Sequence, residues 1–202
     1  MESKQEKIAG IILAAGSSER MGRAKQLLPF QGKPLLQHIL DNVRCSTQLD
    51  LFLLLLGCRA EEIKNQLETQ GINLEYVSNY FHGQSASLRC GLNRAEDLGV
   101  SAALILLGDQ PLISSFVIDS IVSEYRTHRD MILIPTCKGK RGNPVLVDAC
   151  MFSLLREIQG DVGGRAIFPR FESSIREVEI SGSEIHTDVD TMTDYIKLQG
   201  NK

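Results

Sequence analysis

Three cations stand close to two glycines near the start of the sequence. Arg20, Arg23 and Lys25 follow or flank Gly16 and Gly22, directly after an apolar run. Glycine lets the backbone turn and approach a ligand closely, while backbone amides and fixed cations neutralise phosphate oxygens. The combination predicts a loop that binds a polyphosphate. An ordinary surface turn remains the alternative, because neither GxxxxGK[ST] nor GxGxxG is present.

Three aspartates could supply a metal site. Asp109 comes directly after the apolar run 102–107 and Gly108, and Asp188 and Asp190 form an acidic pair near the C-terminus. Carboxylates that act together with phosphate oxygens are usual ligands of Mg²⁺, and carboxylates from distant loops can share one cation. We therefore expect Asp109 and Asp190 to ligate Mg²⁺. Two plainer interpretations stay open: Asp109 caps a helix or forms an Asx turn, and the second pair lies in an exposed turn.

The apolar pattern predicts the elements that position these residues. Continuous apolar runs at 8–12, 49–56 and 102–107 are typical of parallel strands covered on both faces. Strands that alternate with amphipathic helices predict an α/β fold with a three-layer, mostly parallel sheet and an antiparallel edge. Ligands bind at the carboxyl ends of such strands. The glycine-rich loop and Asp109 are therefore expected to face one site.

Other segments have weaker patterns. Residues 61–70 predict a solvated helix, residues 143–147 a strand, and residues 175–180 alternate like an edge or antiparallel strand. Ser114 or Ser115 is expected to cap the helix that follows.

Composition and length narrow the class of protein. The 202 residues are 43% hydrophobic, which predicts one domain spanning residues 1–202 with a sizeable core. The net charge of -3 argues against a nucleic-acid partner, and no apolar run predicts a membrane span. The polar N-terminus lacks a signal-peptide core, so we expect a cytoplasmic protein. The five scattered cysteines, without a CxxC pair, favour neither disulfides nor zinc.

The order of several motifs resembles that of one enzyme family. LAAGSSERMGRAK at 13–25 resembles the N-terminal signature of nucleotidyltransferases that activate sugars, alditols and pterins. The later motifs look like those of the molybdenum cofactor cytidylyltransferases: QSASL at 84–88, LGDQP at 107–111, RGNPVL at 141–146, GDVGGR at 160–165 and DVDT at 188–191. The resemblance covers nearly the whole chain. It implies a Rossmann-like nucleotidyltransferase fold of the nucleotide-diphospho-sugar transferase type.

The resemblance also implies a reaction and site roles. CMP passes from CTP to the phosphate of a molybdopterin-type molybdenum cofactor, pyrophosphate leaves, and Mg²⁺ is the cofactor. Lys25, Arg20 and Asp109 are then the expected catalytic residues. The nucleotide is expected to contact Leu13, Ala14, Ala15, Gly16, Gly22, Lys25, Ser85, Ser87 and Leu88. The acceptor is expected to contact Arg141, Asn143 and Arg165, with solvated turn residues as the alternative for the first two.

The base preference and the rival functions follow from the same motifs. Ala-Ala-Gly at 14–16 resembles the cytidine-specific form of the family, whereas Ala-Gly-Gly resembles the guanosine-specific form. One methyl group discriminates by only about 1–3 kcal/mol, so polar contacts to the base must add the rest. The alternatives are a guanylyltransferase, a sugar- or alditol-phosphate cytidylyltransferase, and a non-catalytic maturation partner that delivers the cofactor to a molybdenum hydroxylase or its chaperone.

Overall fold

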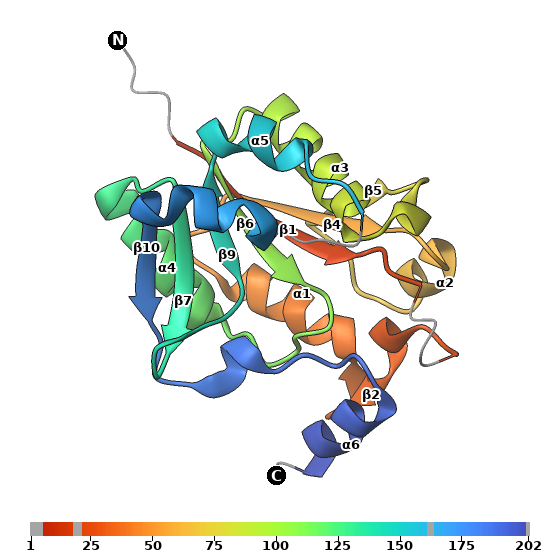
Figure 1. Cartoon of the computed structure of the whole chain (residues 1–202). Coiled ribbons are helices and arrows are strands. Elements are labelled where there is room, and N and C mark those ends of the chain that lie inside the picture. The colour runs from red at the N-terminus through yellow and green to blue at the C-terminus, as the bar shows by residue number, and fades with distance from the viewer. Residues whose placement is uncertain (1–5, 18–21, 161–163, 201–202) are drawn as a thin grey trace.

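A computed structural model describes residues 6–17, 22–160 and 164–200 of the chain. Arg20 and residues 161–163 of the predicted motifs lie outside the described residues. The centre of the structure is an eight-stranded sheet with the order β10-β7-β9-β6-β1-β4-β5, in which β8 also pairs with β7 (Figure 1).

The elements alternate along the chain much as the apolar pattern predicts. The strands of the sheet are β1 (Ile8–Ala14), β4 (Leu51–Leu56), β5 (Asn73–Tyr76), β6 (Ala102–Leu107), β7 (Ile132–Cys137), β8 (Lys140–Arg141), β9 (Val145–Asp148) and β10 (Ile175–Glu179), and β2 (Pro29–Phe30) pairs with β3 (Lys33–Pro34). The α-helices are α1 (Leu35–Cys45), α2 (Ala60–Lys64), α3 (Gln84–Asp97), α4 (Ser115–His128), α5 (Phe152–Arg156) and α6 (Met192–Gly200). Short 3-10 helices are η2 (Lys25–Leu27), η3 (Tyr80–His82), η4 (Ala149–Met151), η5 (Gly164–Ser174) and η6 (Ser183–His186).

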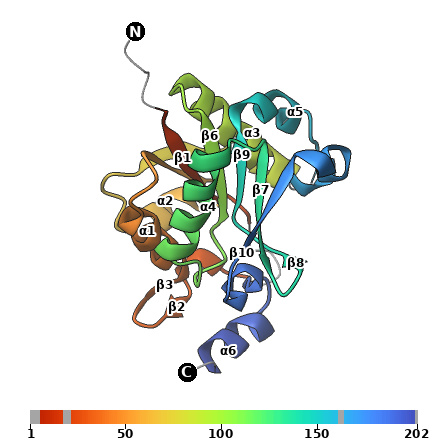
Figure 2. The same ribbon diagram turned by 90° about the vertical axis from the view of Figure 1, so that its left-hand side faces the viewer.

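Helices cover both faces of the sheet, which confirms the three-layer prediction. Helices α1 and α4 pack with one set of strand side chains, and α3, α5 and η5 pack with the other set. Figure 2 shows the two helical layers on opposite sides of the strands. All seven residues of β1 are buried, as expected of a parallel strand between two layers.

The register of the central strands brings their carboxyl ends together. Strand β1 runs parallel to both neighbours, and Leu13 is paired with Leu55 of β4 and with Leu107 of β6. The loops that follow β1 and β6 therefore leave the sheet side by side, at the edge where ligands bind in such folds.

The direction of two strands differs from the expectation of an antiparallel edge. The antiparallel strand β9 lies inside the sheet, between β6 and β7. The short connection from β7 through β8 leaves no room for the crossover that parallel strands need, so β9 must return antiparallel. Strand β10 is the edge strand but runs parallel to β7, since the chain reaches it through α5 and η5. The alternating pattern of this strand reflects its partial exposure at the edge of the sheet. It does not indicate whether the strand runs parallel or antiparallel to its neighbour.

Helix boundaries also follow tertiary contacts. The predicted helix at 61–70 ends early, at Lys64. Beyond it, Arg44 donates to the carbonyls of Glu68 and Gln70, and Gln37 accepts from the Glu68 amide, so these backbone groups are satisfied without a helix. Ser114 caps α4 through a hydrogen bond from the Val117 amide, as expected.

The C-terminal helix packs on the β2–β3 hairpin. Leu198 and Tyr195 of α6 share a small apolar cluster with Phe30 and Val189, and the Tyr195 hydroxyl donates to the Pro29 carbonyl at 2.6 Å. The far end of the chain is thereby fixed beside the segment that carries Lys25. None of the helices in the described ranges is long and apolar enough to cross a membrane.

Candidate active site

The loop after β1, the loop after β6 and the segment before α6 converge on one point. The Lys25 ammonium lies 2.6 Å from Oδ2 of Asp109 and 2.9 Å from Oδ1 of Asp190. The side chains of Lys25 and Asp109 are mostly buried, whereas Asp190 is half exposed. Three of the residues selected from the sequence are therefore in direct contact, although they come from distant positions.

Close backbone packing places Asp109. The amide of the preceding Gly108 donates to the Leu13 carbonyl at 3.0 Å. A Cβ on Gly108 would lie 2.9 Å from that of Ala14, so only glycine allows β1 and β6 to end this close together. The Asp109 carbonyl accepts from the Val189 amide at 3.0 Å. Because Val189 is fully buried, this bond fixes Asp190 beside Asp109.

A capping box starts α6 immediately after Asp190. The Thr191 amide and hydroxyl both donate to Oδ2 of Asp194, and the Asp194 amide donates back to the Thr191 hydroxyl. These bonds satisfy free amides of the first helical turn, and they hold the pKa of Asp194 below its ordinary value. The acidic segment is thus part of an ordered helix start.

Gln26 holds the end of β1 from inside the protein. Its side chain is 3% exposed, and Nε2 donates to the carbonyls of Ala14 and Gly16 at 3.0 and 3.3 Å. Gly22 has a φ of 64°, a left-handed conformation that favours glycine. The backbone around Lys25 is therefore set by a buried amide and a conformationally required glycine.

The site holds more negative than positive charge. Burial raises the pKa of Asp109, the positive charge and hydrogen bond of Lys25 oppose this, and the charges of Asp190 and Asp188 add to the rise. Burial alone would lower the pKa of Lys25, but its contacts with Asp109 and Asp190 outweigh burial and keep the pKa above its ordinary value. Lys25 therefore stays protonated between two carboxylates.

The donor set fits a divalent cation that binds together with other oxygen ligands. Asp109 and Asp190 already converge on one cation, the Lys25 ammonium. Oδ1 of Asp109 is buried and has no hydrogen-bond partner in the part of the chain that the structure describes. Within that part, no three His, Cys, Asp or Glu side chains form a metal cluster. A pair of carboxylates suits Mg²⁺ or Mn²⁺, which take water and phosphate oxygens as their remaining ligands.

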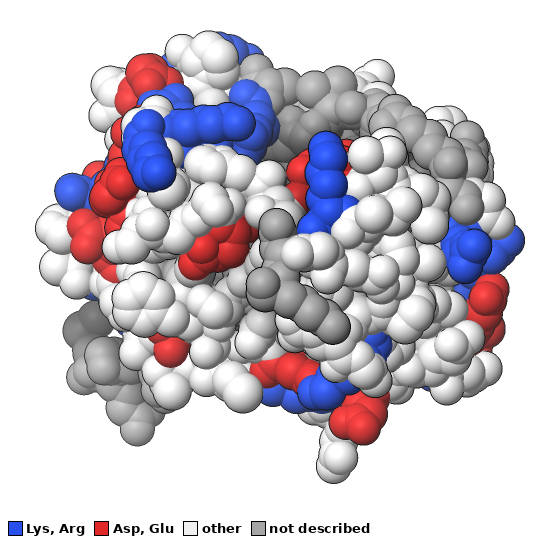
Figure 3. Space-filling view, turned by 90° about the horizontal axis from the view of Figure 1, so that it is seen from below, with Lys and Arg blue, Asp and Glu red and all other residues white. Residues whose placement is uncertain are grey.

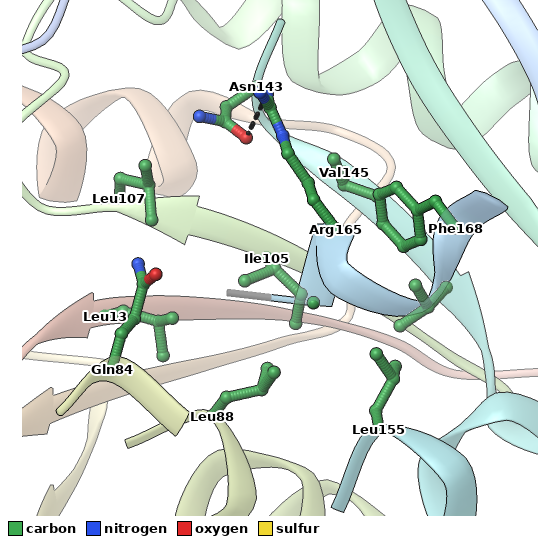
Figure 4. Close-up of a pocket in the computed structure, with 12 residues that line it drawn as sticks. Leu13, Gln84, Leu88, Ile105, Leu107, Asn143, Val145, Leu155, Arg165 and Phe168 are labelled. Carbon is green, nitrogen blue, oxygen red and sulfur yellow. Dashed lines mark hydrogen bonds between the residues drawn. The ribbon is translucent and has the colours of Figure 1, made fainter. Parts of the chain in front are cut away.

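An apolar cavity of about 260 Å³ lies at the ends of β1 and β6 (Figure 4), where Leu13 and Leu107 line it close in the chain to Asp109. Its floor comes from β1, β6 and β9, and its walls come from α3, α5 and η5. The lining residues are Leu13, Gln84, Leu88, Ile105, Leu107, Asn143, Val145, Val147, Leu155, Gly164, Arg165 and Phe168. Only Gln84, Asn143 and Arg165 bring polar side-chain atoms. The cavity suits an apolar or aromatic group with a few polar substituents.

The predicted nucleotide-binding residues divide between two faces of the sheet. Leu13 and Leu88 line the cavity. The side chain of Ala14 packs with the α1 layer and that of Ala15 with the α3 layer, because successive strand residues alternate. A single pocket lined by the side chains of Leu13, Ala14 and Ala15 therefore does not form. A ligand contact with Ala14 requires its backbone.

The two predicted serines lie inside the protein. Ser85 and Ser87 are 3% and 5% exposed, in the first turn of α3. Neither is among the cavity-lining residues. The Ser85 amide donates to the Gly160 carbonyl at 3.3 Å, which joins α3 to the start of the glycine-rich motif at 160–165.

The three predicted acceptor residues are connected to different partners. Nη2 of Arg165 donates to Oδ1 of Asn143 at 2.9 Å, and both residues line the cavity (Figure 4). Arg141 points elsewhere, to the carboxylates of Glu172 and Glu177. A Cβ on Gly142 would lie 2.6 Å from the Ile185 carbonyl, so glycine allows this segment to pack against η6.

Sequence reasoning missed three residues of this region. Gln26 gives the one sequence signal, a glutamine before two leucines in a segment that packs on the core. Gln84 and Phe168 also line the cavity. Gln84 opens the motif at 84–88 but is assigned no role from the sequence, and no pattern in the sequence distinguishes Phe168.

Comparison with known proteins identifies the family. A model described as "MobA-like NTP transferase domain" matches residues 10–175. The chain belongs to this family. It is 26% identical over 190 residues to the molybdenum cofactor cytidylyltransferase of Escherichia coli (strain K12), covering 92% of each chain. It is also 24% identical to the purine catabolism protein PucB of Bacillus subtilis (strain 168), covering 93% of this chain and 94% of the relative.

Solved structures show the same fold. The crystal structure of Rv0371c from Mycobacterium tuberculosis H37Rv matches with a TM-score of 0.86 and 28% identity, covering 97% of this chain and 99% of that one. A manganese complex of Rv0371c matches with a TM-score of 0.81 and 26% identity, covering 97% and 100%. The architecture is that of the nucleotide-diphospho-sugar transferase fold, as the sequence motifs predicted. This chain is therefore a nucleotidyltransferase of the MobA-like family.

Proposed function

We propose that this protein transfers CMP from CTP to the phosphate of a molybdopterin-type molybdenum cofactor and releases pyrophosphate, with Mg²⁺ as the metal. The observation that carries the proposal is the convergence of Lys25, Asp109 and Asp190, with the apolar cavity at the ends of β1 and β6. The E. coli relative with the cytidylyltransferase name covers nearly the whole chain, and the Ala-Ala-Gly sequence at 14–16 supports CTP over GTP.

The chemistry requires charge neutralisation more than proton transfer. The acceptor phosphate oxygen attacks the α-phosphorus of CTP, and the bond to the departing pyrophosphate breaks. Because the nucleophile is already ionised, a general base is not needed. Both reactants are anions, so the protein must hold them together in line and screen their repulsion.

Lys25 is the described cation best placed for the triphosphate. Its ammonium is protonated and lies at the end of the glycine-rich loop. Backbone amides from Ala15 to Gly22, and the side chain of Arg20 outside the described residues, are proposed to hold the phosphates with it. Gln26 keeps the end of β1 in the conformation that presents this loop.

Asp109 and Asp190 are proposed to hold the Mg²⁺ ion. Oδ1 of Asp109, which has no hydrogen-bond partner among the described residues, and the carboxylate of Asp190 are proposed to bind it once Lys25 turns toward the phosphates. A bound divalent ion supplies positive charge to the phosphate oxygens. In this arrangement both aspartates serve as oxygen ligands.

The cavity and its polar rim are proposed to take the acceptor. Leu13, Ile105 and Leu107 give it an apolar floor, and the guanidinium of Arg165 lies at its rim. A pterin has flat apolar faces and polar edges, which fits this lining. Gly16 is proposed to contact the nucleotide. Leu13 and Leu88, which the sequence suggested for the nucleotide, line this cavity together with Gln84 and are proposed to contact the acceptor instead.

Purified protein, CTP and molybdenum cofactor test the proposal through pyrophosphate release. We expect release that depends on both substrates and on Mg²⁺, and CTP ahead of GTP, ATP and UTP in a four-nucleotide panel. Preference for GTP would make the protein a guanylyltransferase. Release with a sugar or alditol phosphate in place of the cofactor would change the acceptor, and no release at all would favour a non-catalytic maturation partner.

A further inference from the structure

The short helical segment η5 forms one wall of the cavity. Phe168 of η5 is 6% exposed and belongs to the same apolar cluster as Val145 and Leu155. Figure 4 shows its ring beside Val145, with Arg165 extending from the same segment toward Asn143. The cavity, at about 260 Å³, is smaller than the roughly 300–1,000 Å³ of most small-molecule sites. It therefore suits one ring system of a ligand.

Two arginine bridges fasten η5 to the segment around β8. Arg141 of β8 donates from Nη1 to Glu172 of η5 at 3.1 Å and from Nε to Glu177 of β10 at 2.7 Å. In the opposite direction, Arg165 of η5 donates to Asn143 at 2.9 Å. Each segment thus contributes one arginine and one acceptor, and the bridges lie at the two ends of the wall.

The two arginines differ in whether carboxylates of the protein neutralise their positive charge. Arg141 contacts two carboxylates, and these hydrogen bonds raise its pKa. Arg165 contacts a neutral amide and has no ion pair with a carboxylate among the residues that the structure describes. Burial lowers its pKa, which the charge of Asp188 partly opposes, but a guanidinium stays protonated. Arg165 can therefore bind an anionic group of a ligand, whereas Glu172 and Glu177 already neutralise the charge of Arg141.

We propose that Phe168 determines acceptor specificity by packing against a flat ring system in the cavity, and that Arg141 is a positioning residue that holds η5 in place through Glu172. The inference rests on the proposed function, since it concerns the acceptor of that reaction. It replaces the sequence-based expectation that Arg141 contacts the acceptor. Arg165 remains the residue that contacts it.

A matched pair of phenylalanine variants tests whether Phe168, in the wall that η5 forms, contacts the acceptor. Phe168→Leu shortens a side chain that lines the cavity, whereas Phe171→Leu makes the same change on the same segment outside the cavity. We expect Phe168→Leu to raise KM for the acceptor about tenfold and to leave KM for CTP unchanged. Phe171→Leu should change neither. Equal effects of the two variants, or a parallel rise in both KM values for Phe168→Leu, would overturn the assignment.

Glu172→Gln separates positioning from direct binding by the sign of its effect. If Arg141 positions η5, the loss of one carboxylate loosens the wall and raises the acceptor KM, by about threefold for an exposed ion pair. If Arg141 binds the acceptor phosphate, the same change frees its charge and lowers that KM. Arg141→Lys keeps the positive charge but loses the planar set of N–H donors that binds two carboxylates. If Arg141 positions η5, this variant must also raise the KM for the acceptor.

Direct binding distinguishes this inference from the proposed reaction. The chain has no tryptophan, so the fluorescence of 6-hydroxymethylpterin can be followed without overlap. We expect saturable quenching with wild type and Phe171→Leu, and about tenfold weaker binding with Phe168→Leu. Pterin binding without pyrophosphate release would reject the proposed function and support the role of Phe168. Pyrophosphate release with the cofactor, together with no pterin binding, would reject the role of Phe168 and support the proposed function.

Discussion

The Lys25 ammonium lies 2.6 Å from Oδ2 of the Asp109 carboxylate. Asp190 contacts the same ammonium from the other side at 2.9 Å. The lysine therefore acts as an internal counter-ion between two carboxylates that would otherwise repel each other. If these carboxylates hold a metal ion, as proposed above, its binding requires the ammonium to leave its place between them.

Replacing this lysine should strengthen metal binding in the absence of nucleotide. We expect Lys25→Met to bind Mn²⁺ about tenfold more tightly than wild type, because a nearby positive charge is removed. CTP binding should weaken at the same time. Titration of free Mn²⁺ by electron paramagnetic resonance measures the first effect. Lys33→Met, which removes an exposed lysine paired with Asp41, is the control, and equal Mn²⁺ affinity in all three proteins would refute the counter-ion role.

The two aspartates before α6 should differ in importance. Asp190 contacts Lys25, whereas within the described residues Asp188 affects Asp109 through its charge. Asp190→Asn should reduce Mn²⁺ affinity and turnover by about tenfold or more, since it removes a ligand oxygen's charge. Asp188→Asn, two residues away, should have a much smaller effect. A larger loss in Asp188→Asn than in Asp190→Asn would mean that the wrong carboxylate has been assigned.

Gln26 offers a test of the loop that it holds. Gln26→Leu keeps a similar volume but leaves the Ala14 and Gly16 carbonyls without their side-chain donor. Each such loss costs about 1–3 kcal/mol when the group stays buried. We expect a higher KM for CTP and a lower melting temperature, measured by steady-state kinetics and calorimetry. Gln37→Leu, which removes a buried glutamine that bonds to Asp41 and the Glu68 amide instead of the loop, should destabilise without raising the KM for CTP.

The buried hydroxyl of Tyr125 should make the folding stability of the protein depend on pH in the alkaline range. Its ring is buried, and its hydroxyl lies 2.6 Å from Asp148 and 3.2 Å from the Ser101 carbonyl. Burial, followed by the hydrogen bond and charge of Asp148, raises its pKa above the ordinary value of 10.0. Above about pH 10 the unfolded chain loses this proton while the folded chain keeps it, so stability falls as pH rises.

Tyr125→Phe should remove that part of the pH dependence. At neutral pH the variant should be less stable by about 1.5–3 kcal/mol, because Asp148 loses a donor. Urea unfolding between pH 7 and pH 11 measures both effects. Tyr76→Phe, at a side chain that is 48% exposed, is the control. A wild-type protein with no loss of stability above pH 10 would show that Tyr125 ionises freely in the folded state.

The sequence predicted the central strands, and it predicted that the glycine-rich loop and Asp109 face one site, because both predictions depend on local signals. The fully apolar runs of β1 and β6 indicate parallel strands, and parallel strands bring the residues after them to one edge. Lys25 and Asp109 could therefore be placed together from two separate segments. The acidic pair at 188 and 190 then supplied Asp190 as the expected partner of Asp109.

Three features could not be predicted from local signals. They are the direction of β9, the face of the sheet on which the Ala14 side chain packs, and the ion-pair partners of Arg141. Strand direction depends on the length of the connections, and the hairpin through β8 makes β9 antiparallel. Arg141 precedes Gly142-Asn143 in a motif associated with the acceptor, but Glu172 and Glu177, more than thirty residues later, take its guanidinium. Such long-range ion pairs leave no pattern in one sequence.

Pyrophosphate release from CTP in the presence of molybdenum cofactor, compared between wild type and Asp109→Ala, measures whether this carboxylate is needed for nucleotidyl transfer. We expect release by wild type that requires cofactor, CTP and a divalent ion, and its loss in Asp109→Ala although that variant remains folded. Equal release by the two proteins, or undiminished release by wild type in excess chelator, would contradict this expectation.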